Sequence, residues 1–291
     1  LDPIVARDGR PFGDGTGNRM RGLPWPLPSA VAGSARRAFV IQEQGRDFSE
    51  KTVDELLQIE VAGLFPVVDG KTMYLPAPMN CVWNRDQDRL YRAKPMSLSE
   101  GEGCDLPDGL RPVMLENPPS DDFKPEPLPA WWPVEKLAAR LTEEASSDQS
   151  GFFSHGDCLK AARSTSRDRV CIDPTTGAAE ESKLFAVSDL TISHLARFLP
   201  DKEEDQKLQP IGLTCRVSAN LLTTGLNILH PLGGNRRLAH WQTAPQLESL
   251  WRCPPTVEEK LRGAKQVCMM LATPALFKGG HLPGWLTGHM G

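Results

Sequence analysis

The sequence lacks the signatures of most enzyme classes. It contains no G-x-S-x-G nucleophile elbow, no P-loop lysine motif and no dinucleotide-binding fingerprint. Its six histidines include no pair at metalloprotease spacing, and none pairs with cysteine at zinc-finger spacing. We therefore expect no catalytic residue, no metal and no cofactor, and we predict that the protein is not an enzyme.

Signals for membranes and disulfides are missing as well. No apolar run is long enough to span a bilayer, and no secretory signal is present. The seven cysteines are scattered without a C-x-x-C pair, which argues against a disulfide framework and favours a reducing cytoplasm. The chain does not begin with methionine and stops just after a glycine-rich turn, so we expect the natural product to extend beyond Gly291.

What is present is the composition of a soluble globular protein with an uneven distribution of charge. The 291 residues, 40% hydrophobic and 24% charged, suffice for one large or two ordinary domains. Residues 1–46 carry seven arginines against four acids, residues 100–150 twelve acids against four bases, and residues 233–291 seven bases against three acids. Basic ends around an acidic middle favour a polyanion site on one face and a protein partner elsewhere.

The stretch from Arg7 to Arg37 carries the main functional signal. Glycines at 13, 15 and 17 form a loop whose backbone can approach a ligand and point N–H groups at an anion. Prolines at 24, 26 and 28 force extended chain up to Ser29, an expected N-cap, after which Ala30 to Arg37 reads as a helix start. This pattern suits a phosphate backbone, and an irregular loop with solvated arginines explains it equally well.

Two later segments repeat the pattern of glycines with basic residues, at 233–237 and 278–280. Trp25, Trp241 and Trp285 lie near the three loops in sequence, and each either stacks on unpaired bases or packs in the core. The candidate RNA-binding residues are Arg7, Arg10, Gly13, Ser29, Gly33, Arg36, Arg37, Gly233, Gly234, Arg236, Arg237, Lys278, Gly279 and Gly280.

Local patterns predict several elements. Two apolar runs flank Asp69-Gly70, the strongest short signal of a tight hairpin. Residues 97–132 are acidic, proline-rich and without periodicity, which indicates a long surface connection. We also expect helices over 49–62, 133–144 and 256–265, a strand–turn–strand over 167–185, and strands over 211–217 and 266–272.

Several motifs together resemble a known family. Asp2-Pro, Arg7-Asp-Gly-Arg-Pro-Phe-Gly and Leu23-Pro-Trp-Pro-Leu-Pro-Ser-Ala-Val-Ala-Gly resemble the opening of RAMP-superfamily CRISPR subunits. Three further segments narrow the resemblance to the family of the third subunit of the Cmr module, the type III-B effector complex. They are Tyr74-Leu-Pro-Ala-Pro, Val170-Cys-Ile-Asp-Pro-Thr-Thr-Gly with Leu184-Phe, and Ala272-Thr-Pro-Ala-Leu-Phe-Lys-Gly-Gly-His-Leu-Pro-Gly.

The resemblance implies an α+β fold of tandem ferredoxin-like (RRM-related, RAMP) domains. We place these over residues 1–150, with the acidic insertion at about 97–132, and 151–291. It also implies a non-catalytic role: anchoring the 5′ repeat-derived tag of the crRNA on the three glycine loops, and bridging the large polymerase-like subunit to the backbone RAMP subunit. His281 stands where the family pattern has an aromatic residue, and the second domain would lack its last strands.

Two alternatives remain open from the residues themselves. The first is a RAMP-type endoribonuclease that trims CRISPR RNA with His155 or His240 as the general base. The second is a protein-binding scaffold that touches no RNA and whose acidic segment over residues 100–150 contacts a basic neighbour.

Overall fold

The computed structural model divides the chain into two compact units, each assembled from several segments. The described residues are 3–9, 18–45, 50–106, 111–117, 123–142, 153, 156–198, 208–218, 225–265, 267, 269–275 and 277. The first unit comprises Leu1–Tyr74, Lys160–Ala196 and Lys207–Arg252, and the second comprises Leu75–Leu159, Arg197–Gln206 and Cys253–Gly291. The predicted domain boundary at residue 150 lies outside the described residues and stays a prediction.

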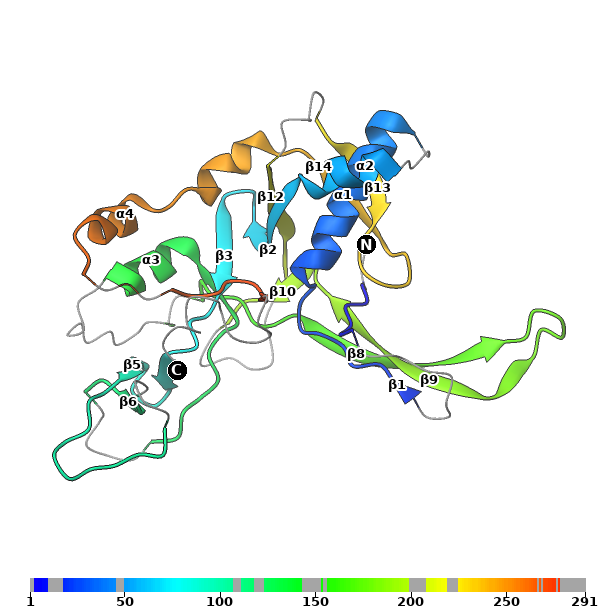
Figure 1. Ribbon diagram of the computed structural model, residues 1–291. Helices are drawn as coiled ribbons and strands as arrows, with labels where there is room; N and C mark the ends of the chain where they lie inside the picture. Colours follow the sequence, from blue (N-terminus) through cyan, green and yellow to red (C-terminus); the bar gives the residue numbers. More distant parts are fainter. Residues whose placement is uncertain are drawn as a thin grey trace. The chain divides into compact units, whose positions relative to one another are not determined.

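The first unit holds most of the strands (Figure 1). Its elements are β1 (Asn18–Arg19), α1 (Pro28–Gln44), α2 (Glu50–Leu57), β2 (Glu60–Val68), β3 (Thr72–Pro76, whose last two residues belong to the second unit), β8 (Arg163–Ile172), β9 (Ala179–Thr191), β10 (His194–Ala196), β11 (Leu208–Pro210), β12 (Gly212–Ser218), β13 (Asn227–Pro231), β14 (Leu238–Gln242) and the 3₁₀ helix η1 (Pro245–Trp251).

The central sheet of this unit pairs β12, β2 and β3 in antiparallel fashion. Asp69 and Gly70, both with positive φ, close the β2–β3 hairpin as the sequence predicts. A bulge interrupts the β12–β2 register between Thr214 and Arg216. Opposite it Gly63 has φ +91°, and a Cβ there would lie 2.6 Å from Cη2 of Trp251, so only glycine fits.

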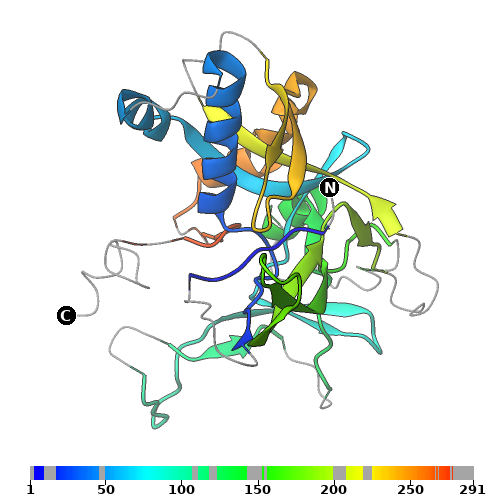
Figure 2. The same cartoon turned by 90° about the vertical axis from the view of Figure 1, so that its right-hand side faces the viewer.

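α1 lies against this sheet and beside the β13–β14 hairpin, which Figure 2 shows as a blue helix next to yellow and orange strands. Val31 of α1 packs with Leu64 of β2 and with Leu232 just after β13. A second cluster joins Val40 to Leu56 and Ile59, which ties the C-terminal half of α1 to α2. The helix is therefore held on two sides, and the described part of the chain leaves its remaining face open.

β8 and β9 form a long antiparallel ribbon that leaves the rest of the unit (Figure 1). Its tip is an Asx turn in which Thr175 N–H donates to Oδ1 of Asp173 at 2.8 Å. Near its base, the buried carboxylate of Asp189 lies 3.2 Å from Arg167 Nε and 3.7 Å from a guanidinium nitrogen of Arg169. The ribbon confirms the predicted strand–turn–strand.

The second unit is smaller and more aromatic. Its elements are β4 (Cys81–Asn84), β5 (Arg89–Pro95), β6 (Val113–Leu115), β7 (Trp131–Pro133), α3 (Val134–Thr142) and α4 (Pro255–Arg262). Trp83, Trp132 and Phe153 meet edge-to-face in its core, with ring centroids 5.3 and 5.5 Å apart. The antiparallel strands β4, β5 and β6 form a three-stranded sheet with β6 at one edge.

The architecture confirms an α+β fold, while the tandem ferredoxin-like arrangement stays a prediction. The helices over 133–144 and 256–265 are present as α3 and α4, and the strand over 211–217 is present as β12. None of the helices in the described part of the chain is both long and apolar enough to cross a membrane.

Three local predictions need correction. α1 begins at Pro28, with Leu27 as N-cap, because proline is pre-organised for the first helical position; Ser29 lies inside the first turn and makes no capping bond. The helix predicted over 49–62 ends at Leu57, since Glu60 already pairs with β12. The described residues within 266–272 form no strand: Met270 packs on the core, but no neighbouring chain completes a ladder.

Candidate nucleic-acid interface

The opening segment, residues 3–9, is buried at Ile4, Val5 and Ala6, where isolated β-bridges join it to the first unit. Ile4 exchanges two backbone hydrogen bonds with Leu190 of β9, at 2.9 and 2.7 Å. The carbonyl of Val5 accepts a 2.7 Å bond from the N–H of Gly234. After the buried Ala6 the chain emerges, and Arg7 is exposed. The segment that precedes the first glycine loop therefore contacts the second glycine loop, at 233–237.

That second loop is a tight turn between β13 and β14. Asn235 and Arg236 both have positive φ, 56° and 49°, as in the type I′ turns that fit a twisted hairpin. Leu232 N–H donates to the carbonyl of Arg237 at 2.8 Å and closes the turn. Gly233 has φ +76°, and a Cβ on it would lie 2.6 Å from the Val5 carbonyl oxygen. Only glycine allows this contact between two segments that are far apart in sequence.

α1 fixes the base of the turn through a buried serine. Ser34 Oγ donates to the carbonyl of Pro231 at 2.5 Å, and Nδ1–H of His230 donates to the same oxygen at 3.1 Å. Burial, together with the positive charge of Arg37, lowers the pKa of His230, although its bond to Pro231 opposes this shift. Arg37 follows Ser34 by three residues in α1, so it lies about one helical turn from the bond to Pro231.

The open face of α1 carries three of the candidate residues. Ser29, Gly33 and Arg37 are spaced by four and therefore share one side of the helix, and all three are exposed. A Cβ added to Gly33 would meet nothing within 4 Å, so packing within the described part of the chain does not require glycine there. The helix backbone is thus accessible at Gly33, between the hydroxyl of Ser29 and the guanidinium group of Arg37.

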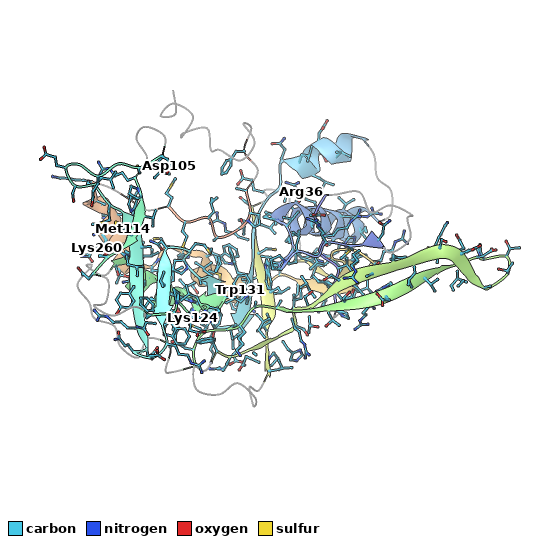
Figure 3. All side chains as sticks on the ribbon, turned by 90° about the horizontal axis from the view of Figure 1, so that it is seen from below. Arg36, Asp105, Met114, Lys124, Trp131 and Lys260 are labelled. Carbon is cyan, nitrogen blue, oxygen red and sulfur yellow. The ribbon has the colours of Figure 1, made fainter. Side chains whose placement is uncertain are left out.

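The paired arginines of α1 have different surroundings. Nε and a terminal nitrogen of Arg36 donate to the carbonyl of Ile59 at 3.0 and 2.7 Å, so this side chain joins α1 to the start of β2. Arg37, one residue later, points to solvent. Figure 3 shows Arg36 beside α1. A contact of Arg36 with RNA stays a prediction, and it would compete with the bond to Ile59.

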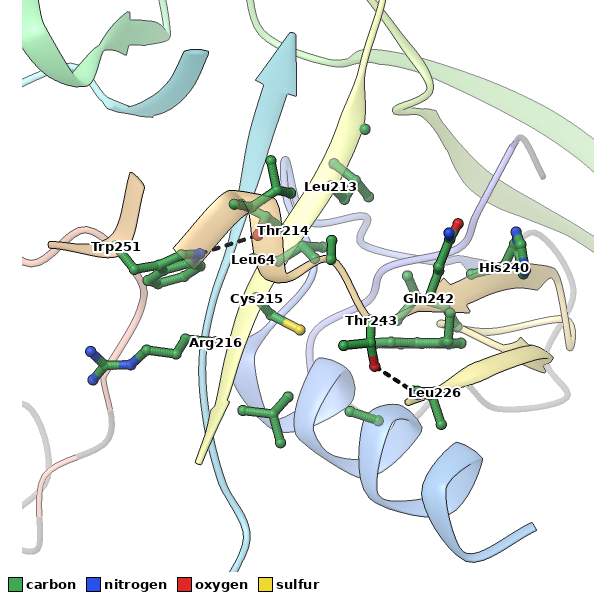
Figure 4. Close-up of a pocket in the computed structure, with 18 of the residues that line it drawn as sticks. Leu64, Leu213, Thr214, Cys215, Arg216, Leu226, His240, Gln242, Thr243 and Trp251 are labelled. Atoms are coloured by element: carbon green, nitrogen blue, oxygen red, sulfur yellow. Dashed lines mark hydrogen bonds between the residues drawn. The ribbon is translucent and has the colours of Figure 1, made fainter. Parts of the chain in front are cut away.

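α1 also lines a cavity of about 730 Å³ in the first unit, shown in Figure 4. Its walls come from α1, β12, β14 and η1, and include Cys215, Trp241 and Trp251. Burial raises the pKa of the Cys215 thiol to about 11, so the thiol is protonated and unreactive at neutral pH. Trp251 Nε1 donates to Thr214 Oγ1 at 3.2 Å, whereas Nε1 of Trp241 is buried without a hydrogen-bond partner in the part of the chain that the structure describes.

The structure thus brings Arg7, Ser29, Gly33, Arg37, Gly233, Gly234, Arg236 and Arg237 onto one unit, with the opening segment in direct contact with the turn at 233–237. Arg10, Gly13, Lys278, Gly279 and Gly280 lie outside the described residues, as does Trp285. Trp25 and Trp241 are half-buried and pack in the core. Sequence reasoning missed Ser34 and His230, which position the turn, because a serine inside a helix and a lone histidine carry no local signal.

No catalytic constellation is evident among the groups that can be placed. His155 lies outside the described residues, and His240 is exposed on β14, where Nε2–H donates to Asn227 Oδ1 at 2.7 Å. Within the described ranges, no three histidine, cysteine or acidic side chains gather closely enough to hold a metal ion.

Comparison with known proteins identifies the family to which the chain belongs. The family model for the CRISPR-associated protein Cas_Cmr3 matches residues 1–290. The chain therefore belongs to the Cas_Cmr3 family, which confirms the resemblance to the third Cmr subunit. No curated protein matches the sequence.

Solved structures give a more distant likeness. One similar chain comes from a cryo-EM structure of the type III-B Cmr-beta bound to cognate target RNA and AMPPnP, state 1, with 13% identity and a TM-score of 0.38. Another comes from the type III-B Cmr-beta bound to cognate target RNA, with 14% identity and a TM-score of 0.40. Each covers 82% of this chain, and the chain spans 59% and 60% of their lengths.

Proposed function

We propose that this chain is a non-catalytic RNA-binding subunit of a type III-B CRISPR (Cmr) ribonucleoprotein complex. It anchors the 5′ repeat-derived tag of the crRNA on the first unit and bridges the large polymerase-like subunit to the backbone RAMP subunit. Membership of the Cas_Cmr3 family supports the assignment to such a complex. The tag site rests on one observation, the contact between the opening segment and the turn at 233–237.

This contact gathers cationic groups that the sequence keeps far apart. Arg7 is exposed two residues after Val5, which pairs with Gly234, and Arg236 is exposed at the tip of the turn. Arg37 is exposed on α1, one turn beyond Ser34, which bonds to the base of the hairpin turn. Gly33 leaves the helix backbone open between them. A single strand has its phosphates at short intervals, and separate guanidinium groups around exposed backbone can contact successive ones.

The test is a salt titration of the assembled complex with crRNA that carries or lacks the tag. Each phosphate neutralised contributes roughly 0.7 to the log–log salt slope of single-strand binding. The double variant Arg37→Ala/Arg236→Ala should therefore lower the slope by about 1.4, and only for the tagged RNA. Arg262→Ala, which removes an exposed arginine of α4 paired with Glu258, is the matched control and should leave the slope unchanged.

Two results would overturn the proposal. One is a slope that the double variant does not change. The other concerns catalysis: if His240→Ala or His155→Ala stopped the trimming of a precursor RNA by the assembled complex, the chain would be the endoribonuclease of the alternative hypothesis.

A further inference from the structure

The edge of the β4–β5–β6 sheet in the second unit has an unusual composition. β6 pairs with β5 alone among the described strands, and its residues Val113 and Met114 are 65% and 55% exposed. Neighbouring residues of a strand point to opposite faces of the sheet. Both faces of this strand therefore present apolar side chains to solvent, at Val113 and Met114, while Leu115 is half-buried.

The hydrogen-bond register shows which backbone groups of β6 are free. Met96 N–H donates to the carbonyl of Pro112, and Glu116 N–H donates to the carbonyl of Arg92. Even-numbered residues therefore face β5, because bonding direction alternates along a strand. The N–H and C=O groups of Val113 and Leu115 point away from β5 and form a free edge in the described part of the chain. Such an edge is a template for another strand unless it is blocked.

The segment next to β6 is acidic. Residues 97–106, in the connection between β5 and β6, are all exposed, and Glu100, Glu102 and Asp105 form no ion pair with any residue that the structure describes. Glu116, by contrast, pairs with Lys94. Figure 3 labels Asp105 and Met114 on this part of the unit. The negative charge disfavours RNA and anionic lipid as ligands, and it complements a basic polypeptide.

We propose that β6 is a docking edge to which a protein partner adds an extended segment that combines apolar residues with lysine or arginine. The partner's backbone pairs with Val113 and Leu115, its apolar side chains cover Val113 and Met114, and its cations face Glu100, Glu102 and Asp105. The docking edge specifies how the chain would bridge two subunits, and this inference rests on that part of the proposed function. Binding of the crRNA tag does not depend on it.

The partner segment is identified by photocrosslinking within the assembled complex, produced by co-expression of all its subunits. The photoreactive residue p-benzoylphenylalanine replaces Met114, and replaces Met79 in a control, because Met79 is 96% exposed and lies outside β6. We expect position 114 to form an adduct with a segment of another subunit that carries lysine or arginine. Position 79 should not form this adduct. An adduct to RNA or to a second copy of this chain, or no adduct, would overturn the proposal.

The mode of pairing is tested with two substitutions of one residue. Val113→Pro removes an outward N–H and leaves the bonds to β5 intact, whereas Val113→Thr keeps the N–H and the branched shape. Binding is measured against the purified subunit that was crosslinked to position 114. We expect Val113→Pro to weaken this binding about tenfold and Val113→Thr to weaken it less than threefold. Equal effects of the two substitutions, or no effect, would refute strand addition.

Both variants are also assayed for bound crRNA in the assembled complex. Loss of the protein partner with retention of RNA separates this inference from the tag-binding proposal. Circular dichroism of the full-length variants checks that each is folded, so a loss of binding reports on the edge itself.

Discussion

The two surfaces to which we assign binding differ in what holds them in place. The basic surface of the first unit is built from segments far apart in sequence, joined by bonds such as Ser34 to Pro231 and Gly234 to Val5. The β6 edge of the second unit belongs to one local hairpin and is held by backbone pairing with β5. Substitutions of the residues that join the segments of the first surface should therefore lower stability, whereas substitutions at the second surface should alter binding alone.

The largest effect on stability is expected at Gly233. Alanine there must adopt a positive φ and places its Cβ 2.6 Å from the Val5 carbonyl oxygen. We expect Gly233→Ala to lower the free energy of unfolding by about 2–4 kcal/mol, measured by urea denaturation of the full chain. Gly103→Ala, in the connection that leads to β6, meets nothing within 4 Å and should stay within about 0.5 kcal/mol of the wild type. Similar losses for both variants would remove the distinction between the surfaces.

The adjacent arginines of α1 provide the next test. Arg36→Ala leaves the Ile59 carbonyl without its two donors and should lower the free energy of unfolding by about 1–2 kcal/mol. Arg37→Ala should change it by less than about 0.5 kcal/mol, because the side chain is exposed. The salt slope of RNA binding should respond in the opposite order, falling more for Arg37→Ala than for Arg36→Ala, whose bond to Ile59 competes with RNA. A stable Arg36→Ala variant with a lowered slope would place Arg36 on the RNA.

His230 makes the first surface sensitive to pH. Burial lowers its pKa in the folded state below the ordinary value of 6.5, so the unfolded chain takes up the proton first as the pH falls. Stability should therefore be constant above about pH 7 and decrease as the pH falls through 6.5. Denaturation midpoints of wild type and His230→Gln between pH 5.5 and 7.5 test this, and the variant should show the flatter profile. The control His240→Gln, on the same hairpin, keeps His230 and should follow the wild type.

The smallest effect is expected at the second surface. Reversing its charge with Glu100→Lys, Glu102→Lys and Asp105→Lys should change the free energy of unfolding by less than about 0.5 kcal/mol, because the three side chains are exposed and form no ion pair with described residues. The same variant should weaken association with the basic partner. A stability loss above about 1 kcal/mol, measured by urea denaturation, would mean that this connection packs on its own unit.

The sequence predicts a structural element correctly when that element depends on residues that are near one another in the chain. The Asp69-Gly70 hairpin, α3 and α4 depend on nearby residues, and all three were predicted. The strand over 266–272 fails because alternation of apolar residues does not supply a pairing partner. The helix start was misplaced by two residues because proline at 28 and serine at 29 are both acceptable near a helix N-terminus.

The candidate site was predicted as a set of residues and not as an arrangement. Glycines and arginines in the loops at 7–17 and 233–237 carry a compositional signal that sequence reasoning can use. That Arg36 bonds to Ile59 while Arg37 stays exposed depends on how α1 is rotated against β2, which no local pattern specifies. The bond between Val5 and Gly234 joins residues that are 229 positions apart, so only the tertiary fold reveals it.

That bond also determines when during synthesis the basic surface can exist. Val5 is synthesised 229 residues before Gly234, its backbone partner in the fold. At about 5–20 residues per second this is a delay of roughly 10–50 s, during which the carbonyl of Val5 lacks its bond to Gly234. The proposed tag site is therefore incomplete in a nascent chain, and we expect RNA loading to follow synthesis of the β13–β14 hairpin.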